Sequence, residues 1–140
     1  MRRETNGRTA IEAVDLLVWE VVTASGELSQ GPECGLSRLL RETAAAALAG
    51  VGAACREEGR RRGIEQLATV LAELRRLATW LDLAERFGDL TAGRALPALE
   101  SQARALAAVD RLRARWLEAE EVGGPVDPTT VELTLPADLA

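Results

Sequence analysis

The apolar positions of the chain repeat with the period of an α-helix in four separate stretches. Between Gly63 and Leu90 they recur every three or four residues, which places them along one face of a helix. This pattern predicts a helix over about 63–88. The inward stripe is Ile64, Leu67, Leu71, Leu74, Ala78 and Leu81, widened by Val70, Leu77 and Ala84. A second apolar set falls on nearly the opposite side. Its members are Trp80, Leu83 and Phe87.

The first helix is predicted over about residues 10–25. Thr9 and Glu12 have the spacing of a capping box, which opens a helix by satisfying its first backbone N–H groups. Leu16 and Trp19 project away from the core line, so this helix also has two apolar faces. The core line is Ile11, Val14, Leu17, Val18 and Val21. The polar, basic residues 1–8 are expected to be a flexible N-terminus.

The second helix is predicted over about residues 35–58 and has mostly small residues on its inward line. Gly50 and Gly52 each cost about 1 kcal/mol of helix propensity relative to alanine. We therefore expect close approach of a neighbouring helix to compensate. The inward line is Leu36, Leu39, Leu40, Thr43, Ala46, Ala47, Gly50, Val51 and Ala54.

The fourth helix is predicted over about residues 92–121, with Gly88 as the C-cap of the third helix and Thr91 as the cap of the fourth. Two apolar stripes are again present. The stripe expected to face the core is Leu96, Leu99, Ala103, Leu106 and Leu117. The stripe expected elsewhere is Val109, Leu112 and Trp116.

Four amphipathic helices joined by short connectors predict an all-α, up-down-up-down four-helix bundle over residues 9–121. Residues 122–140 are expected to be an acidic, flexible tail. Within the tail Val131, Leu133 and Leu135 alternate with polar residues, so an edge strand added to another surface remains an alternative.

The second apolar faces predict contact between copies of the chain, because tryptophan is favoured at interfaces. The alternative is that the helix stripes drift and that all four aromatic residues share one core. The expected oligomer interface is Leu16, Trp19, Trp80, Leu83, Phe87, Val109, Leu112 and Trp116.

Composition argues against an enzyme. The chain has no histidine, which removes the commonest general base and the commonest metal ligand, so we expect no metal and no cofactor. The carboxylates Glu73, Asp82, Glu85 and Glu100 fall on polar faces, where a solvated surface is the simpler interpretation. No apolar run is long enough to span a membrane and the start lacks an apolar signal region, so a cytoplasmic location is expected.

The net charge of −5 conceals a nearly neutral body, because residues 1–117 carry 16 acids and 17 arginines. Arg56 with Arg60, Arg61 and Arg62 forms the only basic cluster, which is either a solvated turn or a set of phosphate contacts repeated around an oligomer. Further candidates are spread around helices. They are Arg75, Arg76, Arg111, Arg113 and Arg115.

Several short motifs of the chain have the residues and spacing of a known family. Two of them are Asp15-Leu16-Leu17-Val18-Trp19 and Leu81-Asp82-Leu83-Ala84 with Leu90. They resemble the D-L-L-x-W and L-R-L-A-x-x-L segments of the accessory variability determinant (Avd) proteins of diversity-generating retroelements. Arg111, Leu112 and Trp116 fall on the family's R-x-L-G-G-W pattern, although Ala114-Arg115 replaces the glycine pair. The chain from Leu28 to Cys34 lacks the arginines of the family's connector.

The resemblance covers about residues 11–117 and implies a ring-shaped homo-oligomer, a homopentamer in that family. Such a ring associates with the retroelement reverse transcriptase and its template RNA or cDNA, and supports mutagenic cDNA synthesis without catalysing it. The wider four-helix-bundle family, which includes proteins encoded in ribosomal RNA intervening sequences, shares the D-L-x-V-W opening. It offers the alternative of a homo-oligomeric protein-interaction bundle with no nucleic-acid role.

Overall fold

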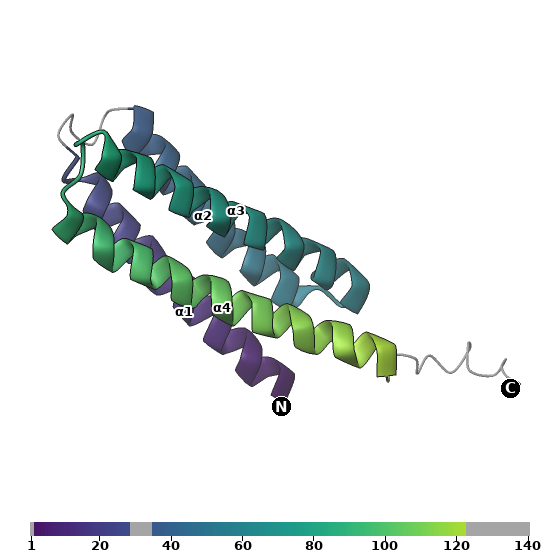
Figure 1. The fold of residues 1–140 in the computed structure, drawn as a ribbon. Coiled ribbons are helices and arrows are strands. Elements are labelled where there is room, and N and C mark those ends of the chain that lie inside the picture. Colours follow the sequence, from purple (N-terminus) through teal and green to yellow (C-terminus); the bar gives the residue numbers. More distant parts are fainter. Residues whose placement is uncertain (1, 29–34, 123–140) are drawn as a thin grey trace, which may run out of the picture.

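The computed structural model describes residues 2–28 and 35–122 of the chain. Within these ranges the backbone forms four α-helices and no strand (Figure 1). The helices are α1 (Arg2–Ser25), α2 (Gly35–Arg56), α3 (Arg60–Arg86) and α4 (Ala92–Val122). The prediction of an all-α four-helix bundle is confirmed.

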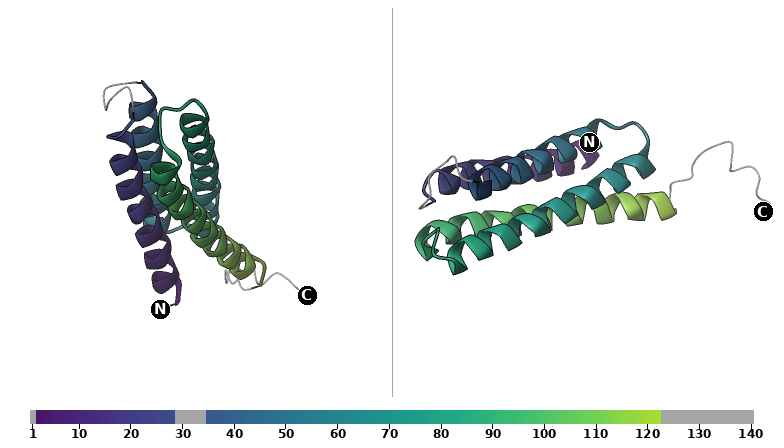
Figure 2. Two further views of the ribbon diagram at one scale, coloured as in Figure 1. Left: turned by 60° about the vertical axis from the view of Figure 1, so that its left-hand side comes forward. Right: turned by 90° about the horizontal axis from the view of Figure 1, so that it is seen from above.

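Each helix packs against two others and lies diagonal to the third. α1 packs on α2 and α4, and α3 packs on the same two helices, so α1 and α3 are diagonal. Figure 2 shows the resulting two layers, α1 with α2 and α3 with α4. The start of α1, the α2–α3 turn and the end of α4 lie at the same end of the bundle (Figure 1).

Leucines from α3 form the centre of the hydrophobic core. Leu67, Leu74, Leu77 and Leu81 are completely inaccessible to solvent, as the three-and-four spacing predicts. They meet large side chains from the other three helices and a line of alanines. The fully buried large residues contributed by the other helices are Val14, Leu17, Val21, Leu40, Val51, Val109 and Leu112.

α1 begins at Arg2 rather than near residue 10, so the predicted flexible N-terminus is helical from its second residue. Thr9 lies well inside the helix, and the prediction that Thr9 and Glu12 cap its start is therefore wrong. Packing explains the extension. Gly7 is buried, and a Cβ built on it would lie 3.0 Å from the Sγ atom of Cys55 in α2. α1 therefore contacts α2 at Gly7, three residues before the predicted start of the helix.

The end of α3 is a Schellman motif built on Gly88. Its φ of 78° lies in the left-handed region, which glycine adopts without a Cβ penalty. The N–H of Gly88 donates to the Glu85 carbonyl at 3.0 Å, and the N–H of Asp89 donates to the Ala84 carbonyl at 2.9 Å. The prediction that Gly88 terminates the third helix is confirmed.

Gly50 permits the close approach of α3 that its position in a helix suggests. A Cβ built on Gly50 would lie 2.7 Å from a Val70 methyl group, which is too close for any real side chain. Gly52 has no such neighbour, since its nearest contact is the flexible end of Arg56 at 3.5 Å. The expected compensation is therefore present at Gly50 and absent at Gly52.

The predicted tail over residues 122–140 lies outside the described residues, except for Val122 at the end of α4. The apolar alternation at Val131, Leu133 and Leu135 falls in the same undescribed range. Both predictions about the tail stay predictions.

Candidate interaction surfaces

The most prominent surface feature is an apolar stripe on the outside of α1. Leu16, Trp19 and Val22 are spaced three residues apart, which places them on one side of the helix, and all three are exposed. Trp19 is 69% exposed, an unusual state for the side chain with the largest apolar area. Together with Glu12, Asp15 and Val18 these residues line a broad, shallow depression of about 570 Å³. We call Leu16, Trp19 and Val22 the α1 face.

Acidic residues border the α1 face. Glu12 and Asp15 line the depression beside Leu16 and Trp19, and the lining contains no cation. The sequence pattern predicted that Leu16 and Trp19 project away from the core, but Val22 was not assigned to this face. The three-residue spacing from Leu16 to Trp19 to Val22 is the sequence signal that identifies Val22 as part of it.

The second apolar set of α3 is divided by the structure. Phe87, the C-cap residue, is 73% exposed, whereas Leu83 is only partly exposed. Trp80 is partly buried against the core, and its indole Nε1 is buried without a hydrogen-bond acceptor among the described residues. Phe87 lies at the end of α3, the helix diagonal to α1, so it is an exposed apolar position separate from the α1 face.

The assignment of the two stripes on α4 is wrong. Val109, Leu112 and Trp116, predicted to lie at an oligomer interface, are buried in the core of the subunit, with Trp116 only 4% exposed. Leu96, predicted to be inward, is 55% exposed, and Leu117 is also exposed. The inward line of the first half of α4 consists instead of small residues. Its members are Ala95, Ala98, Ser101 and Ala105.

Space explains this reversal on α4. Gly63 of α3 lies against Trp116, and because glycine has no side chain it leaves space for the indole ring at this end of the bundle. Farther along, alanines on α4 face the bulky leucines of α3, so large residues oppose small ones. The line of alanines from Ala95 to Ala108 is the sequence signal that reveals the inward side.

The basic cluster lies at the α2–α3 turn, but its four arginines are not equivalent. Arg56 and Arg61 are exposed. Arg62 is exposed with its Nε 4.0 Å from a Glu57 carboxylate oxygen, a distance at which attraction through water is weak. Arg60 is partly buried, and its Nε has no acceptor within the described part of the chain.

Electrostatics at the start of α3 favour an anion. Arg60, Arg61 and Arg62 occupy its first turn, which contains no acidic residue, and the N-cap Gly59 makes no side-chain cap. The positive end of the helix dipole coincides there with three guanidinium groups, which weakens the helix and attracts negative charge. This arrangement is compatible with phosphate contacts at the end of the bundle.

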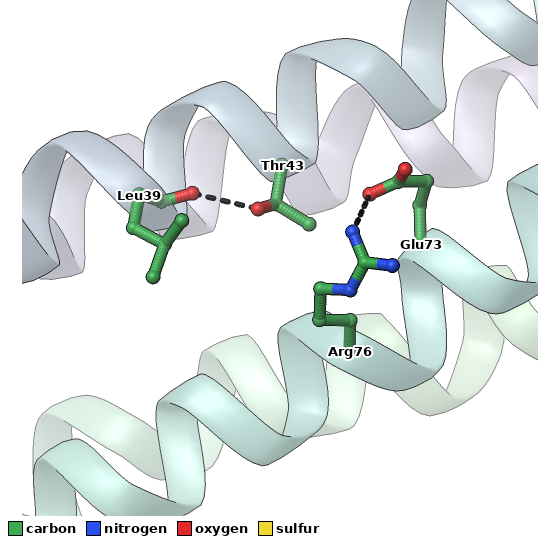
Figure 3. Close-up of polar contacts among 4 residues, drawn as sticks. All are labelled: Leu39, Thr43, Glu73 and Arg76. Atoms are coloured by element: carbon green, nitrogen blue, oxygen red, sulfur yellow. Dashed lines mark hydrogen bonds and ion pairs between the residues drawn. The ribbon is translucent and has the colours of Figure 1, made fainter.

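The other candidate arginines have different surroundings. Arg75 and Arg76 are both exposed, and Arg76 donates a hydrogen bond to the Glu73 carboxylate on the same helix at 3.3 Å (Figure 3). Figure 3 also shows the hydrogen bond from the Thr43 hydroxyl to the Leu39 carbonyl of α2. Arg113 is partly buried and donates to the Ile64 carbonyl at 3.4 Å. Arg111 and Arg115 are exposed and line a small hollow between α1 and α4, together with Thr9, Ala108 and Leu112.

A further groove runs between α2 and α3, with a volume of about 210 Å³. Its floor is formed by small residues of α2 and by Val70, and its polar lining is Gln66, Thr69 and Glu73. The Gln66 Oε1 atom has no donor in the described structure.

No group of three or more histidine, cysteine, aspartate or glutamate residues in the described ranges is placed to hold a metal ion. None of the four described helices combines the length and the apolar character needed to cross a membrane. Comparison of the chain with protein-family models, with curated proteins and with solved structures gives no match.

Proposed function

We propose that the protein is a non-catalytic helical adaptor that works as a homo-oligomer, with the α1 face as a main contact between subunits. The exposure of Trp19 on a stripe with Leu16 and Val22 is the observation that carries the proposal. Burying the exposed part of a tryptophan side chain contributes roughly 4 kcal/mol of transfer free energy, before the costs of association.

The positions of Phe87 and Leu96 support a head-to-tail arrangement of the subunits. Phe87 lies at the end of α3, the helix diagonal to α1, and Leu96 lies on α4; both are exposed and neither belongs to the α1 face. When different patches of identical subunits meet, the contact is heterologous, and it closes into a ring if the rotation between subunits allows it. A ring of this kind agrees with the homopentamer that the Avd resemblance implies.

The adaptor role that we infer is that of the Avd-like proteins: association with a retroelement reverse transcriptase and its template RNA in support of mutagenic cDNA synthesis. Two features support it. The segment Asp15–Trp19, which carries the resemblance, also carries the exposed Leu16 and Trp19. Arg60–Arg62 place three cationic side chains at the positive end of α3, where phosphate groups are attracted.

One observation favours a second candidate, a homo-oligomeric protein-interaction bundle with no nucleic-acid role. The partial burial of Arg60 and the proximity of Glu57 to Arg62 leave the cluster with fewer fully solvated cations than its sequence indicates. Self-association through the α1 face is common to both candidates, so RNA binding separates them.

The test is titration of a labelled, structured RNA by fluorescence anisotropy over a range of low salt concentrations. The wild type is compared with Arg60→Ala/Arg61→Ala/Arg62→Ala and with a matched control, Arg38→Ala/Arg86→Ala/Arg104→Ala. The control removes the same charge from exposed arginines on α2, α3 and α4, of which Arg86 alone has a described ion pair, a solvent-exposed one with Asp82.

We expect the cluster variant to lose affinity and to reduce the slope of log affinity against log salt by roughly 2–3, at about 0.7 per phosphate contact on a single strand and about 0.9 on a double helix. The control should retain most of the affinity. Absence of RNA binding by the wild type at low salt would discard the nucleic-acid role and leave the protein-interaction bundle.

A further inference from the structure

We propose that the hollow between α1 and α4 is a binding site for a single phosphate group, held by Arg111 and Arg115. The hollow is lined by Thr9 from α1 and by Ala108, Arg111, Leu112 and Arg115 from α4. Its position between α1 and α4 is distinct from the α2–α3 turn, which carries Arg56 and Arg60–Arg62.

The two guanidinium groups have no ion-pair partner among the described residues. Other arginines do form ion pairs, among them Arg62, Arg76, Arg86 and Arg94. Glu118 is one turn beyond Arg115, yet no ion pair within 4.0 Å joins them. Two like charges four residues apart on a helix repel each other, and an anion between them removes that repulsion.

The size and composition of the hollow suit a phosphate group. Its volume of about 50 Å³ leaves room for roughly four water-sized groups, which is the scale of the oxygen atoms on one phosphorus and far less than a nucleoside needs. Leu112 and Ala108 form an apolar floor that provides no ligand atom for a cation. The guanidinium groups bind phosphate oxygens through paired N–H donors. These properties select an oxyanion of phosphate type as the ligand.

The hollow lies within one subunit, so binding of the anion does not require assembly. Only the identity of the molecule that carries the phosphate group rests on the proposed function. For an RNA-associated adaptor, the phosphate group is a phosphodiester of the RNA. The alternative source is free phosphate or pyrophosphate. Both sources present the same oxygen atoms to Arg111 and Arg115.

The experiment measures two ligands, pyrophosphate by isothermal titration calorimetry and a single-stranded RNA oligonucleotide by anisotropy. The variants are Arg111→Ala/Arg115→Ala, the charge-preserving Arg111→Lys/Arg115→Lys, and the control Arg38→Ala/Arg104→Ala, which removes two exposed arginines elsewhere. Exposed helical arginines tolerate alanine well, and circular dichroism verifies that each variant folds.

We expect the alanine variant at the hollow to lose at least tenfold in affinity and, for the RNA, to lower the salt slope by about 1.4. The lysine variant should recover the slope but only part of the affinity, because it keeps the charge and loses the paired donors. The control should weaken RNA binding by less than threefold.

An effect on both ligands, or on RNA alone, identifies a phosphodiester site, and an effect on pyrophosphate alone identifies a site for free phosphate. Failure of wild-type RNA binding would contradict the proposed nucleic-acid role while leaving pyrophosphate as the readout of the hollow. Equal losses in the hollow variant and in the control, or no pyrophosphate or RNA binding at all, would overturn the site.

Discussion

Trp116 of α4 packs on Gly63 of α3 so closely that a Cβ on Gly63 would lie 2.9 Å from the Cζ3 atom of the indole. The same Cβ would lie 3.3 Å from the backbone carbonyl oxygen of Ala54 in α2. Gly63 is therefore the point where three helices converge around the largest side chain of the core. The packing at this end of the bundle depends on the absence of a side chain there.

Gly63→Ala should destabilise the subunit by up to about 2 kcal/mol in urea unfolding. Alanine improves helix propensity by about 1 kcal/mol, but overpacking against a ring and a backbone oxygen costs about 1–3 kcal/mol. The matched control is Gly52→Ala, which meets only the flexible end of Arg56 at 3.5 Å and should stabilise by about 0.5–1 kcal/mol. Equal stability of the two variants would contradict the packing described for Trp116.

Gly50 and Val70 should be energetically coupled. Gly50→Ala places a methyl group 2.7 Å from the Val70 Cγ2 atom and should destabilise, whereas Val70→Ala removes that atom at a cost of about 2 kcal/mol in lost burial. In the double variant the new methyl group occupies the vacated space. A double-mutant cycle should therefore give a favourable coupling of about 1 kcal/mol, and strict additivity would show that α2 and α3 are not in contact at this point.

The tryptophans should differ in their contribution to the folding of one subunit. Trp116→Ala removes a buried ring and should cost about 3–5 kcal/mol. Trp19→Ala removes an exposed ring and should change the free energy of unfolding by about 0.5 kcal/mol or less when protein is dilute. At high concentration Trp19→Ala should additionally lose the stabilisation that assembly supplies. A large loss for Trp19→Ala in dilute solution would place its role inside the subunit instead.

Much of the fold follows from local patterns in the sequence. The three-and-four spacing in α3 predicts its buried leucines correctly, and Gly88 marks its end because only a residue tolerant of positive φ completes the Schellman motif. The exposed position of Trp19 is also predicted, because the core line of α1 is complete without it. These successes depend on interactions within one helix.

The failures depend on contacts between helices. The inward side of α4 is misassigned because its leucines are larger than its alanines, yet Ala95 and Ala98 are the buried residues, in a core that also contains the bulky leucines of α3. The burial of Trp116 depends on Gly63, which lies 53 positions away in sequence and gives no local signal. The contact between Gly7 of α1 and Cys55 of α2 likewise gives no local signal in the sequence.

The most direct test of self-association through the α1 face is the molar mass in solution by multi-angle light scattering at tens of micromolar protein. The wild type should give a stable multiple of the 15.0 kDa subunit, five-fold if the ring is that of the Avd-like proteins. Trp19→Glu should give the subunit mass, because a charge cannot be buried in an apolar contact. The control Ala72→Glu, which adds the same charge to an exposed site on α3, should keep the wild-type mass. A monomeric wild type, or a Trp19→Glu variant that still assembles, would contradict the account.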